Sequence, residues 1–152
     1  MLSQTVEYAL RAMVLLASST PDEALGSDAI AERTQAPKGY LSKILRDLVV
    51  AGLISSQRGP RGGFMLARPA ARISMLDVVN AVDPIDRIAR CPLGNPAHTK
   101  LCPLHRRLDD AIASVEREFA RTSLAEVIDS GTRDANACSA LIDVWSKRRA
   151  KS

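Results

Sequence analysis

Four residues with soft or borderline ligand atoms fall close together in this chain. Cys91, His98, Cys102 and His105 include both of its histidines and two of its three cysteines. Thiolate and imidazole groups bind zinc or iron-sulfur clusters, and a free thiol can instead undergo redox chemistry. Loop cysteines also pack without any chemical role, and a histidine that begins a helix can bond only to backbone. A metal or cluster site, a redox-active thiol and a purely structural loop are therefore all open at this point.

The third cysteine has a different setting. Cys138 shares a helical stripe with Leu141, Val144 and Trp145 in an amphipathic segment predicted over 137–145. Cysteine is among the most frequently buried residue types, so packing is the expected role of this side chain. We expect no structural disulfide, because three cysteines cannot pair completely and a cytosolic protein is kept reduced.

The composition predicts a mostly helical protein with an aliphatic core. Apolar residues make up 46% of the 152 residues but aromatic residues only 3%, a balance that suits packed helices. The length suits one core with an appended arm. No apolar run approaches the ~20 residues that cross a bilayer, and no signal pattern opens the chain, which favours the cytoplasm and no membrane contact. The chain contains no nucleophile elbow or Walker sequence, so we do not expect an enzyme.

Positive charge is concentrated between residues 35 and 72. This segment holds seven Lys and Arg residues but only Asp47 as an acid, a net charge of +6 in a chain that carries +4 overall. The remaining residues are therefore net −2. Such a footprint favours a polyanionic partner, although a solvated basic face would have the same composition.

Three helices are predicted before and within this basic segment. Apolar spacing predicts the first over 5–17, and Ser27 is expected to cap a second over 28–34. After a turn over 35–37 a third helix is expected over 38–51, with Pro37 or its neighbour at its first position and Gly52 after its end.

The third helix is predicted to have an apolar back and a basic front. Its apolar face carries Leu41, Ile44, Leu45 and Leu48, and its solvent face carries Lys38, Gly39, Ser42, Lys43 and Arg46. Two short helices joined by a tight turn, the second with such a front, are typical of a helix-turn-helix.

A glycine-rich hairpin is expected to follow. Strands are predicted over 53–56 and 64–66, and the loop between them would place Arg58 and Arg61 at its tip, where arginine can meet phosphates or enter a minor groove. The same loop could cradle a nucleotide phosphate. The chain has no Gly-Lys-Ser/Thr after it, and a strand rather than a helix follows, so we favour a wing.

The second half of the chain is predicted to hold a long helix with an unpartnered seam. A short helix over 75–82 ends at Asp83-Pro84, and residues 88–101 have no periodicity. A long helix then begins at Pro103, and its three- and four-residue apolar steps are typical of a coiled-coil seam, formed by Leu104, Leu108, Ala111, Val115 and Phe119. Residues 123–126 read as a capping box for one more helix.

Four stretches of this sequence resemble the Rrf2 family of transcription regulators. They are Glu7-Tyr8-Ala9-Leu10-Arg11, Gly39-Tyr40-Leu41, the wing from Arg58 to Phe64, and Cys102-Pro103-Leu104-His105. The resemblance covers residues 1 to 130, and the Arg-Gly-Pro-x-Gly-Gly wing is its most specific part. It implies a winged helix-turn-helix, a long dimerisation helix and often a cluster in the loop before that helix. It also implies that Tyr40, Ser42 and Lys43 face the major groove and Arg58 the minor groove.

The cysteine pattern departs from that family. Members that bind a cluster usually have three cysteines in the loop, whereas here Cys91 and Cys102 stand alone with ten residues between them. Some relatives take a further ligand from an acidic residue on the first helix of the partner subunit, and Glu7 occupies that position. The resemblance thus allows a mixed-ligand [2Fe-2S] site made of Cys91, Cys102, His105 or His98, and Glu7 from the other chain. As an ordinary alternative, Glu7 forms an i,i+4 pair with Arg11.

Together these patterns predict a mostly α protein with a small β-hairpin wing, in which a winged helix-turn-helix is followed by a long dimerisation helix. The expected divisions are a DNA-binding domain over 1–83, a sensor or cofactor loop over 84–103, the dimerisation helix and a short helix over 104–130, and a C-terminal helix with a basic tail over 131–152. We predict a homodimeric repressor that binds double-stranded DNA at a pseudo-palindromic operator. We expect it to sense redox state, iron or nitric oxide through a cluster or thiols in the loop. The alternative is a cytosolic metal or iron-sulfur carrier, which would not need the wing.

Overall fold

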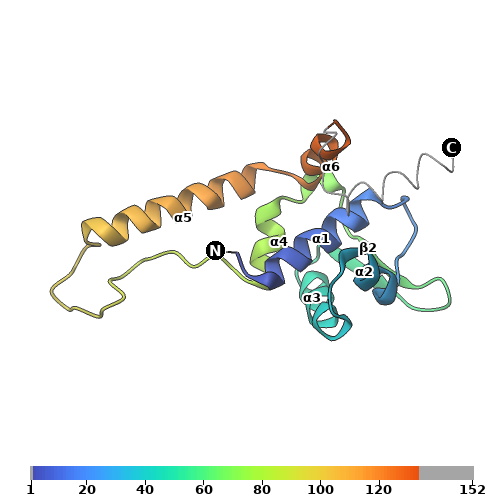
Figure 1. The fold of residues 1–152 in the computed structure, drawn as a ribbon, viewed down its shortest axis with the longest axis horizontal. Helices are drawn as coiled ribbons and strands as arrows, with labels where there is room; N and C mark the ends of the chain where they lie inside the picture. Colours follow the sequence, from blue (N-terminus) through green and yellow to red (C-terminus); the bar gives the residue numbers. More distant parts are fainter. Residues whose placement is uncertain (1, 134–152) are drawn as a thin grey trace.

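A computed structural model describes residues 2–133 of the chain, and Figure 1 shows their arrangement. Six helices and one two-stranded antiparallel sheet occur in this part. In chain order the elements are α1 Gln4–Ser18, α2 Ser27–Thr34, α3 Lys38–Val50, β1 Ile54–Gln57, β2 Gly63–Leu66, the 3-10 turn η1 Ala70–Arg72, α4 Met75–Val82, α5 Pro103–Arg121 and α6 Leu124–Arg133. The predicted fold class is confirmed. The segment 137–145, Cys138 and the basic tail lie outside the described residues.

Helix α1 is the centre of the core. Ser3 caps it by accepting a hydrogen bond from the Val6 amide at 3.3 Å, which satisfies one of the free N–H groups at a helix start. Ala9, Ala12 and Met13 of its apolar stripe are fully buried, and Leu10 and Ala17 are half-buried at its edge. Helices α2, α3, α4 and α6 and strand β2 all contact α1, so a single aliphatic core unites them.

The helix-turn-helix forms with different caps from those predicted. Ser27 is not the cap of α2 but its first residue, because Gly26 takes the extended N-cap conformation. Pro37 is likewise the N-cap of α3 and not a helical residue, and α3 ends at Val50, one residue earlier than expected. Between the helices Gln35 adopts a left-handed conformation with φ of 56°, and this turn orients α3 across α2.

Both strands of the hairpin form, but β1 lies one residue later than predicted and β2 begins one residue earlier. Leu53 is buried before the strand begins, and the register pairs Ile54 with Leu66 and Gln57 with Gly63. The chain before α2 adds to this sheet, since Leu25 and Phe64 exchange both backbone hydrogen bonds, at 2.9 and 2.8 Å. The wing is therefore attached to the core along one edge.

A second backbone bridge joins the two halves of the chain. Ser74 and Ser123 form an isolated antiparallel bridge, flanked by bonds from the Met75 amide to the Thr122 carbonyl at 2.9 Å and from the Leu124 amide to the Ile73 carbonyl at 2.9 Å. Each serine also caps a helix, and the capping box predicted over 123–126 is confirmed by the bond between the Glu126 amide and Ser123 Oγ at 3.2 Å. With Leu124 fully buried, the C-terminal end of α5 is held firmly on the core.

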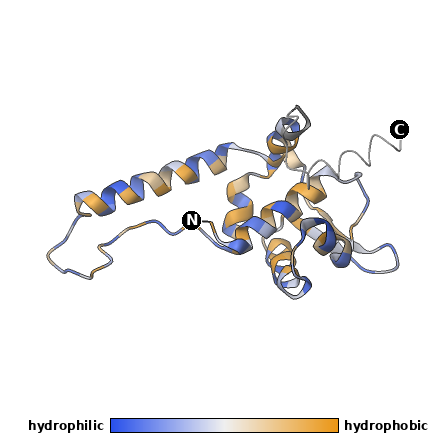
Figure 2. Ribbon diagram, viewed as in Figure 1, coloured by the Kyte–Doolittle hydropathy of each residue, from blue (hydrophilic) through white to orange (hydrophobic). Residues whose placement is uncertain are grey.

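Helix α5 and the loop before it form an arm that projects from the core (Figure 1). The helix is 19 residues long with Pro103 at its first position, as the sequence predicted. Figure 2 shows apolar and polar residues mixed along the whole helix, whereas apolar residues concentrate in the elements of the core. A helix that extends away from its own core with part of its apolar surface uncovered presents that surface for another contact.

Candidate functional site

The outer face of α3 is a polar surface set by the helix period. Leu41, Ile44, Leu45 and Leu48 are all buried against the core. The residues predicted to read DNA lie on the other side and are all exposed, namely Lys38, Gly39, Tyr40, Ser42, Lys43 and Arg46. No neighbouring atom lies within 4 Å of the position that a Cβ would take on Gly39, so another molecule can approach the chain closely at the start of α3.

Two lysines on this face have acidic neighbours without being buried by them. Lys38 Nζ lies 3.1 Å from Asp28 and Lys43 Nζ lies 2.7 Å from Asp47, and the lysine side chains are 73% and 69% exposed. Surface ion pairs contribute little free energy and are screened by salt. Both ammonium groups therefore remain available to a stronger anionic partner.

Tyr40 is held in place on the same face. Its hydroxyl lies 2.8 Å from Thr5 Oγ1 on α1, and its ring meets the Tyr8 ring edge-on at 6.1 Å between centroids. The side chain is nevertheless 49% exposed. The ring thus stands at the surface in one fixed orientation, which suits contact with a base or a sugar.

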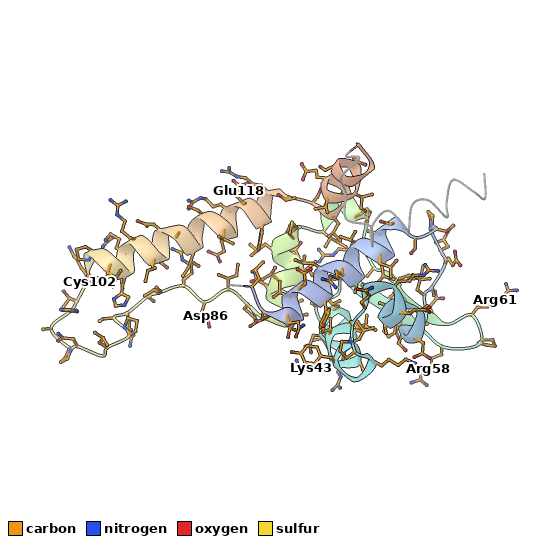
Figure 3. All side chains as sticks on the ribbon, viewed as in Figure 1. Lys43, Arg58, Arg61, Asp86, Cys102 and Glu118 are labelled. Atoms are coloured by element: carbon orange, nitrogen blue, oxygen red, sulfur yellow. The ribbon has the colours of Figure 1, made fainter. Side chains whose placement is uncertain are left out.

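The wing places two arginines beyond the sheet. Arg58 follows β1 and Arg61 lies in the loop, and both are exposed. In Figure 3 Arg61 is at the far end of the wing, while Arg58 and Lys43 both project toward the lower edge of the view. Two guanidinium groups on a short glycine-rich loop can reach a backbone or a narrow groove next to α3.

The candidate sensor loop brings two of its predicted ligands together. Cys102 is the N-cap of α5, and its Sγ lies 3.3 Å from Nδ1 of His105 one turn later. Cys91 is half-buried at the other end of the loop, and His98 is exposed. Within residues 2–133 no three His, Cys, Asp or Glu side chains come close enough to hold a metal ion. One chain therefore brings together only two candidate ligand atoms, Cys102 Sγ and His105 Nδ1. A metal ion or cluster with four protein ligands would need two more donors from other residues or from a second chain.

Glu7 is engaged within its own chain. Its carboxylate accepts a hydrogen bond from Arg11 Nε at 3.0 Å, the i,i+4 pair that the sequence analysis left as the alternative role. The Glu7 side chain is 53% exposed, so a second molecule can reach it. Its role as a ligand in trans stays a prediction.

The arm is stiffened by an ion cluster that sequence spacing did not reveal. Arg87 donates two hydrogen bonds to Asp109, at 2.7 and 2.6 Å, and a third to Glu116 at 3.1 Å. The Ile88 amide also donates to Asp109, at 2.9 Å. These bonds lower the pKa of Asp109, mainly through Arg87, and raise that of the guanidinium. They fix the start of the loop along α5, and because the partners are distant in sequence no local pattern signals them.

The predicted seam of α5 is uncovered at its outer end. Leu104 and Leu108 are 64% and 47% exposed, Ala111 is exposed, and Val115 and Phe119, nearer the core, are half-buried. The exposed leucines are the residues that a second copy would be expected to cover.

The comparisons with known proteins agree with this geometry. Residues 2–130 match the model of the Rrf2 family, described as an iron-dependent transcriptional regulator. The chain belongs to the Rrf2 family. An HTH-type transcriptional regulator of Mycobacterium tuberculosis is 35% identical over 131 residues, which cover 83% of this chain and 80% of that protein. A second such regulator, of Neisseria meningitidis, is 31% identical over 80% of this chain and 83% of its own.

Solved structures of other transcription regulators have the same fold as this chain. CymR, the global cysteine regulator of B. subtilis, is 26% identical and superposes with a TM-score of 0.66, over 84% of this chain and 95% of its own. IscR of T. potens superposes with a TM-score of 0.70 at 23% identity, over 86% and 87% of the two chains, a likeness of fold alone. This Rrf2 protein is accordingly a transcriptional regulator and not an enzyme, as predicted. No helix among those described is long and apolar enough to span a membrane.

The sequence analysis did not predict that three residues of α1 contact the helix-turn-helix. These residues are Thr5, Tyr8 and Arg11. The first two contact Tyr40 of α3, and Arg11 donates a hydrogen bond to the last carbonyl of α2, that of Thr34. Their spacing of three residues was the available signal, since it places them on one helix face.

Proposed function

We propose that this Rrf2 protein is a homodimeric, sequence-specific DNA-binding repressor that reads a pseudo-palindromic operator. The observation that carries the proposal is the exposed basic face of α3 next to a wing that bears Arg58 and Arg61. In such a dimer two recognition helices enter major grooves about one helical turn apart, ~34 Å, and each wing follows the backbone toward the minor groove. Tyr40, Ser42 and Lys43 would meet the major groove and Arg58 the minor groove.

The dimer is supported by the seam of α5. Leu104, Leu108 and Ala111 are exposed on a helix that projects from its own core. A coiled-coil-like contact between two such helices would remove this apolar surface from water.

We further propose that the loop over 84–103 is the sensor of the repressor. The donor pair of Cys102 and His105 fits zinc or an iron-sulfur cluster in chemistry, but one chain does not complete the ligand set. Cys91, His98 and the partner's Glu7 are the candidates for the remaining positions of a [2Fe-2S] cluster. A bound cluster would supply redox, iron or nitric oxide sensitivity, and it would connect the loop of one subunit to α1 of the other.

The DNA proposal is tested with a duplex that the wild-type protein selects from random sequences. Arg58→Ala should weaken operator binding by about ten-fold or more, because a minor-groove arginine is lost. Lys43→Ala, if this lysine meets phosphate, should lower affinity for all sequences and reduce the salt slope by about one. Arg121→Ala, on α5, is the matched control.

If wild type and both variants bind every duplex equally, the proposed DNA surface is wrong. A protein that binds iron or zinc but selects no duplex would instead be a metal or cluster carrier.

A further inference from the structure

The loop between α4 and α5 is bound to α5 near its start. The Arg87 guanidinium donates hydrogen bonds to both carboxylate oxygens of Asp109, at 2.7 and 2.6 Å, and to Glu116 at 3.1 Å. The next backbone amide, that of Ile88, also donates to Asp109, at 2.9 Å. We call these four bonds the loop anchor. Its residues are neither candidate ligands of the proposed sensor nor part of the proposed DNA surface, so neither proposal accounts for them.

The loop anchor fixes a side chain and the backbone together. Two parallel bonds between a guanidinium and a carboxylate hold one relative orientation, which a single ion pair does not. The carboxylate side chains are mostly covered, since Asp109 is 16% and Glu116 29% exposed. The bond from the Ile88 amide adds a point at which the main chain itself is held. The anchor therefore defines the turn of α5 at which the loop begins.

The place of the anchor on α5 matches the length of the first loop segment. Asp109 comes seven residues after Cys102, about 10 Å along a helix. Cys91 comes three residues after Ile88, and three residues of fully extended chain also span about 10 Å. In Figure 3 Asp86, just before the anchor, lies nearer the core than Cys102 at the tip, so the loop runs toward the start of α5. Held at Asp109, the segment is long enough to bring Cys91 level with Cys102.

Another register would keep Cys91 away from the start of α5. Glu116 comes fourteen residues after Cys102, about 21 Å along the helix. If the Ile88 amide were bound there, the three residues that follow it would cover only about half of that distance. Three of the four anchor bonds go to Asp109. The anchor thus selects the register in which the two cysteines can approach each other.

The first loop segment ends at Cys91 in a turn. The Gly94 amide donates to the Cys91 carbonyl at 3.0 Å, and Gly94 has a left-handed φ of 64°. The chain returns from this turn to Cys102, whose Sγ lies 3.3 Å from His105 Nδ1. Within residues 2–133 no third ligand joins that pair at metal-binding distance. Cys91 therefore joins it only if the segment between the anchor and the turn moves.

We propose that Arg87 is a positioning residue of the loop, which it fixes on α5 in the register that keeps Cys91 within reach of the Cys102 and His105 pair. The inference rests on the proposed function, because it takes this loop as the sensor. It explains how candidate ligands are held near one another before any ligand binds, which lowers the entropic cost of closing a site. Without the anchor, Cys91 would be connected to Cys102 only through the ten residues between them.

The first experiment measures how often Cys91 meets Cys102 in metal-free, reduced protein. All proteins carry Cys138→Ala, so the two loop cysteines are the only thiols. A short bismaleimide is added, and the cross-link within one protomer is followed by mass spectrometry relative to labelling of single thiols. Arg87→Gln should lower the cross-linking rate by about three-fold or more, because the effective concentration of Cys91 near Cys102 falls.

Two further variants separate the anchor from a general effect of charge. Arg87→Lys should recover only part of the rate, because an ammonium group cannot form two parallel bonds to Asp109. Arg90→Gln removes the same charge from the same loop outside the anchor, and it should cross-link as the wild-type protein does. All measurements are made well below the melting midpoint of every variant.

The second experiment asks whether Arg87 acts through Asp109. Asp109→Asn should reproduce the loss of cross-linking, and the double variant with Arg87→Gln should match the single variants. Hydrogen exchange of the Ile88 amide should become faster in each of them. The Leu25 amide, which is bonded to Phe64 at the wing, is the internal control and should keep its exchange rate.

Zinc titration of the metal-free protein connects the anchor to the proposed sensor. Arg87→Gln should bind zinc roughly three-fold more weakly than the wild-type protein, because the same approach of Cys91 limits both reactions. Arg90→Gln should bind zinc as the wild-type protein does.

The inference is overturned if Arg87→Gln cross-links as fast as wild type or faster, if Arg90→Gln loses as much, or if the double variant shows additive losses. Failure of the proposed function gives a different result. In that case the wild-type protein binds neither zinc nor iron, and operator affinity does not respond to replacement of Cys91 or Cys102, whereas cross-linking still depends on Arg87.

Discussion

Gly63 shows at the scale of a single residue how the wing is attached. It has φ of +146°, and a Cβ built there would lie 2.4 Å from the backbone carbonyl of Leu25. Because these neighbours are backbone atoms of a hydrogen-bonded bridge, they cannot move without breaking it. We expect Gly63→Ala to destabilise the protein by about 2–4 kcal/mol, measured by denaturant unfolding.

Gly39 provides the matched control for that substitution. It lies in α3 with nothing within 4 Å of a built Cβ. Alanine favours a helix over glycine by about 1 kcal/mol, so Gly39→Ala should stabilise the fold even if it alters DNA binding. Equal destabilisation by both variants would contradict this account of the wing.

The Arg87 and Asp109 pair predicts a response to acid. Because Arg87 lowers the pKa of Asp109 in the folded protein, this pair contributes stability above the ordinary carboxylate pKa of about 4 and loses it as pH falls toward the lowered value. Between these two pKa values, the free energy of unfolding of Asp109→Asn should fall less with decreasing pH than that of the wild-type protein. In Arg87→Gln the pKa of Asp109, followed by NMR, should return toward its ordinary value. An unchanged titration in Arg87→Gln would show that the pair does not form in solution.

At the scale of elements, the proposed dimer depends on the exposed seam of α5. Leu108 is on the exposed seam, and Arg117 lies on the opposite side of the same helix by the helix period. Leu108→Glu should place a charge in the dimer contact and shift the mass toward the monomer at micromolar concentration, as measured by light scattering. Arg117→Glu should remain a dimer. A monomeric wild-type protein would contradict the proposed seam.

At the scale of the whole molecule, the proposed sensor loop and the wing lie at opposite ends. In Figure 3 Cys102 is at the tip of the arm and Arg61 at the end of the wing. One chain offers a route between them through α5, whose base is bridged to the start of α4, and α4 in turn contacts α3. A change of loop shape could reset the spacing of two recognition helices in a dimer along this route.

That route leads to a prediction for Cys91 and Cys102. Replacing each with Ala should lower the iron content of anaerobically purified protein, with loss of absorbance near ~400 nm, since both are proposed ligands of a cluster. Operator affinity should then no longer differ between reducing and oxidising buffer. Cys138→Ala is the matched control. If neither iron content nor affinity changes in Cys91→Ala or Cys102→Ala, the loop is structural.

Local patterns in the sequence were sufficient for most of the elements. The 3.6-residue period predicted α1, α3 and α5, and α4 has the predicted bounds of Met75–Val82. The basic face of α3, the glycine-rich wing and the seam of α5 also follow from residue type and spacing. Caps were less well predicted, as Ser27 and Pro37 show, because several neighbouring residues can satisfy the same free backbone groups.

The amino-acid sequence by itself thus determined the helices, the wing, the polar front of α3 and the regulator family. Only the tertiary structure decided which distant residues meet: Leu25 with Phe64, Arg87 with Asp109, Ser74 with Ser123, and Arg11 with Thr34. The physical reason is that periodicity records which face of an element is buried, whereas a contact between distant segments depends on how the elements pack against one another.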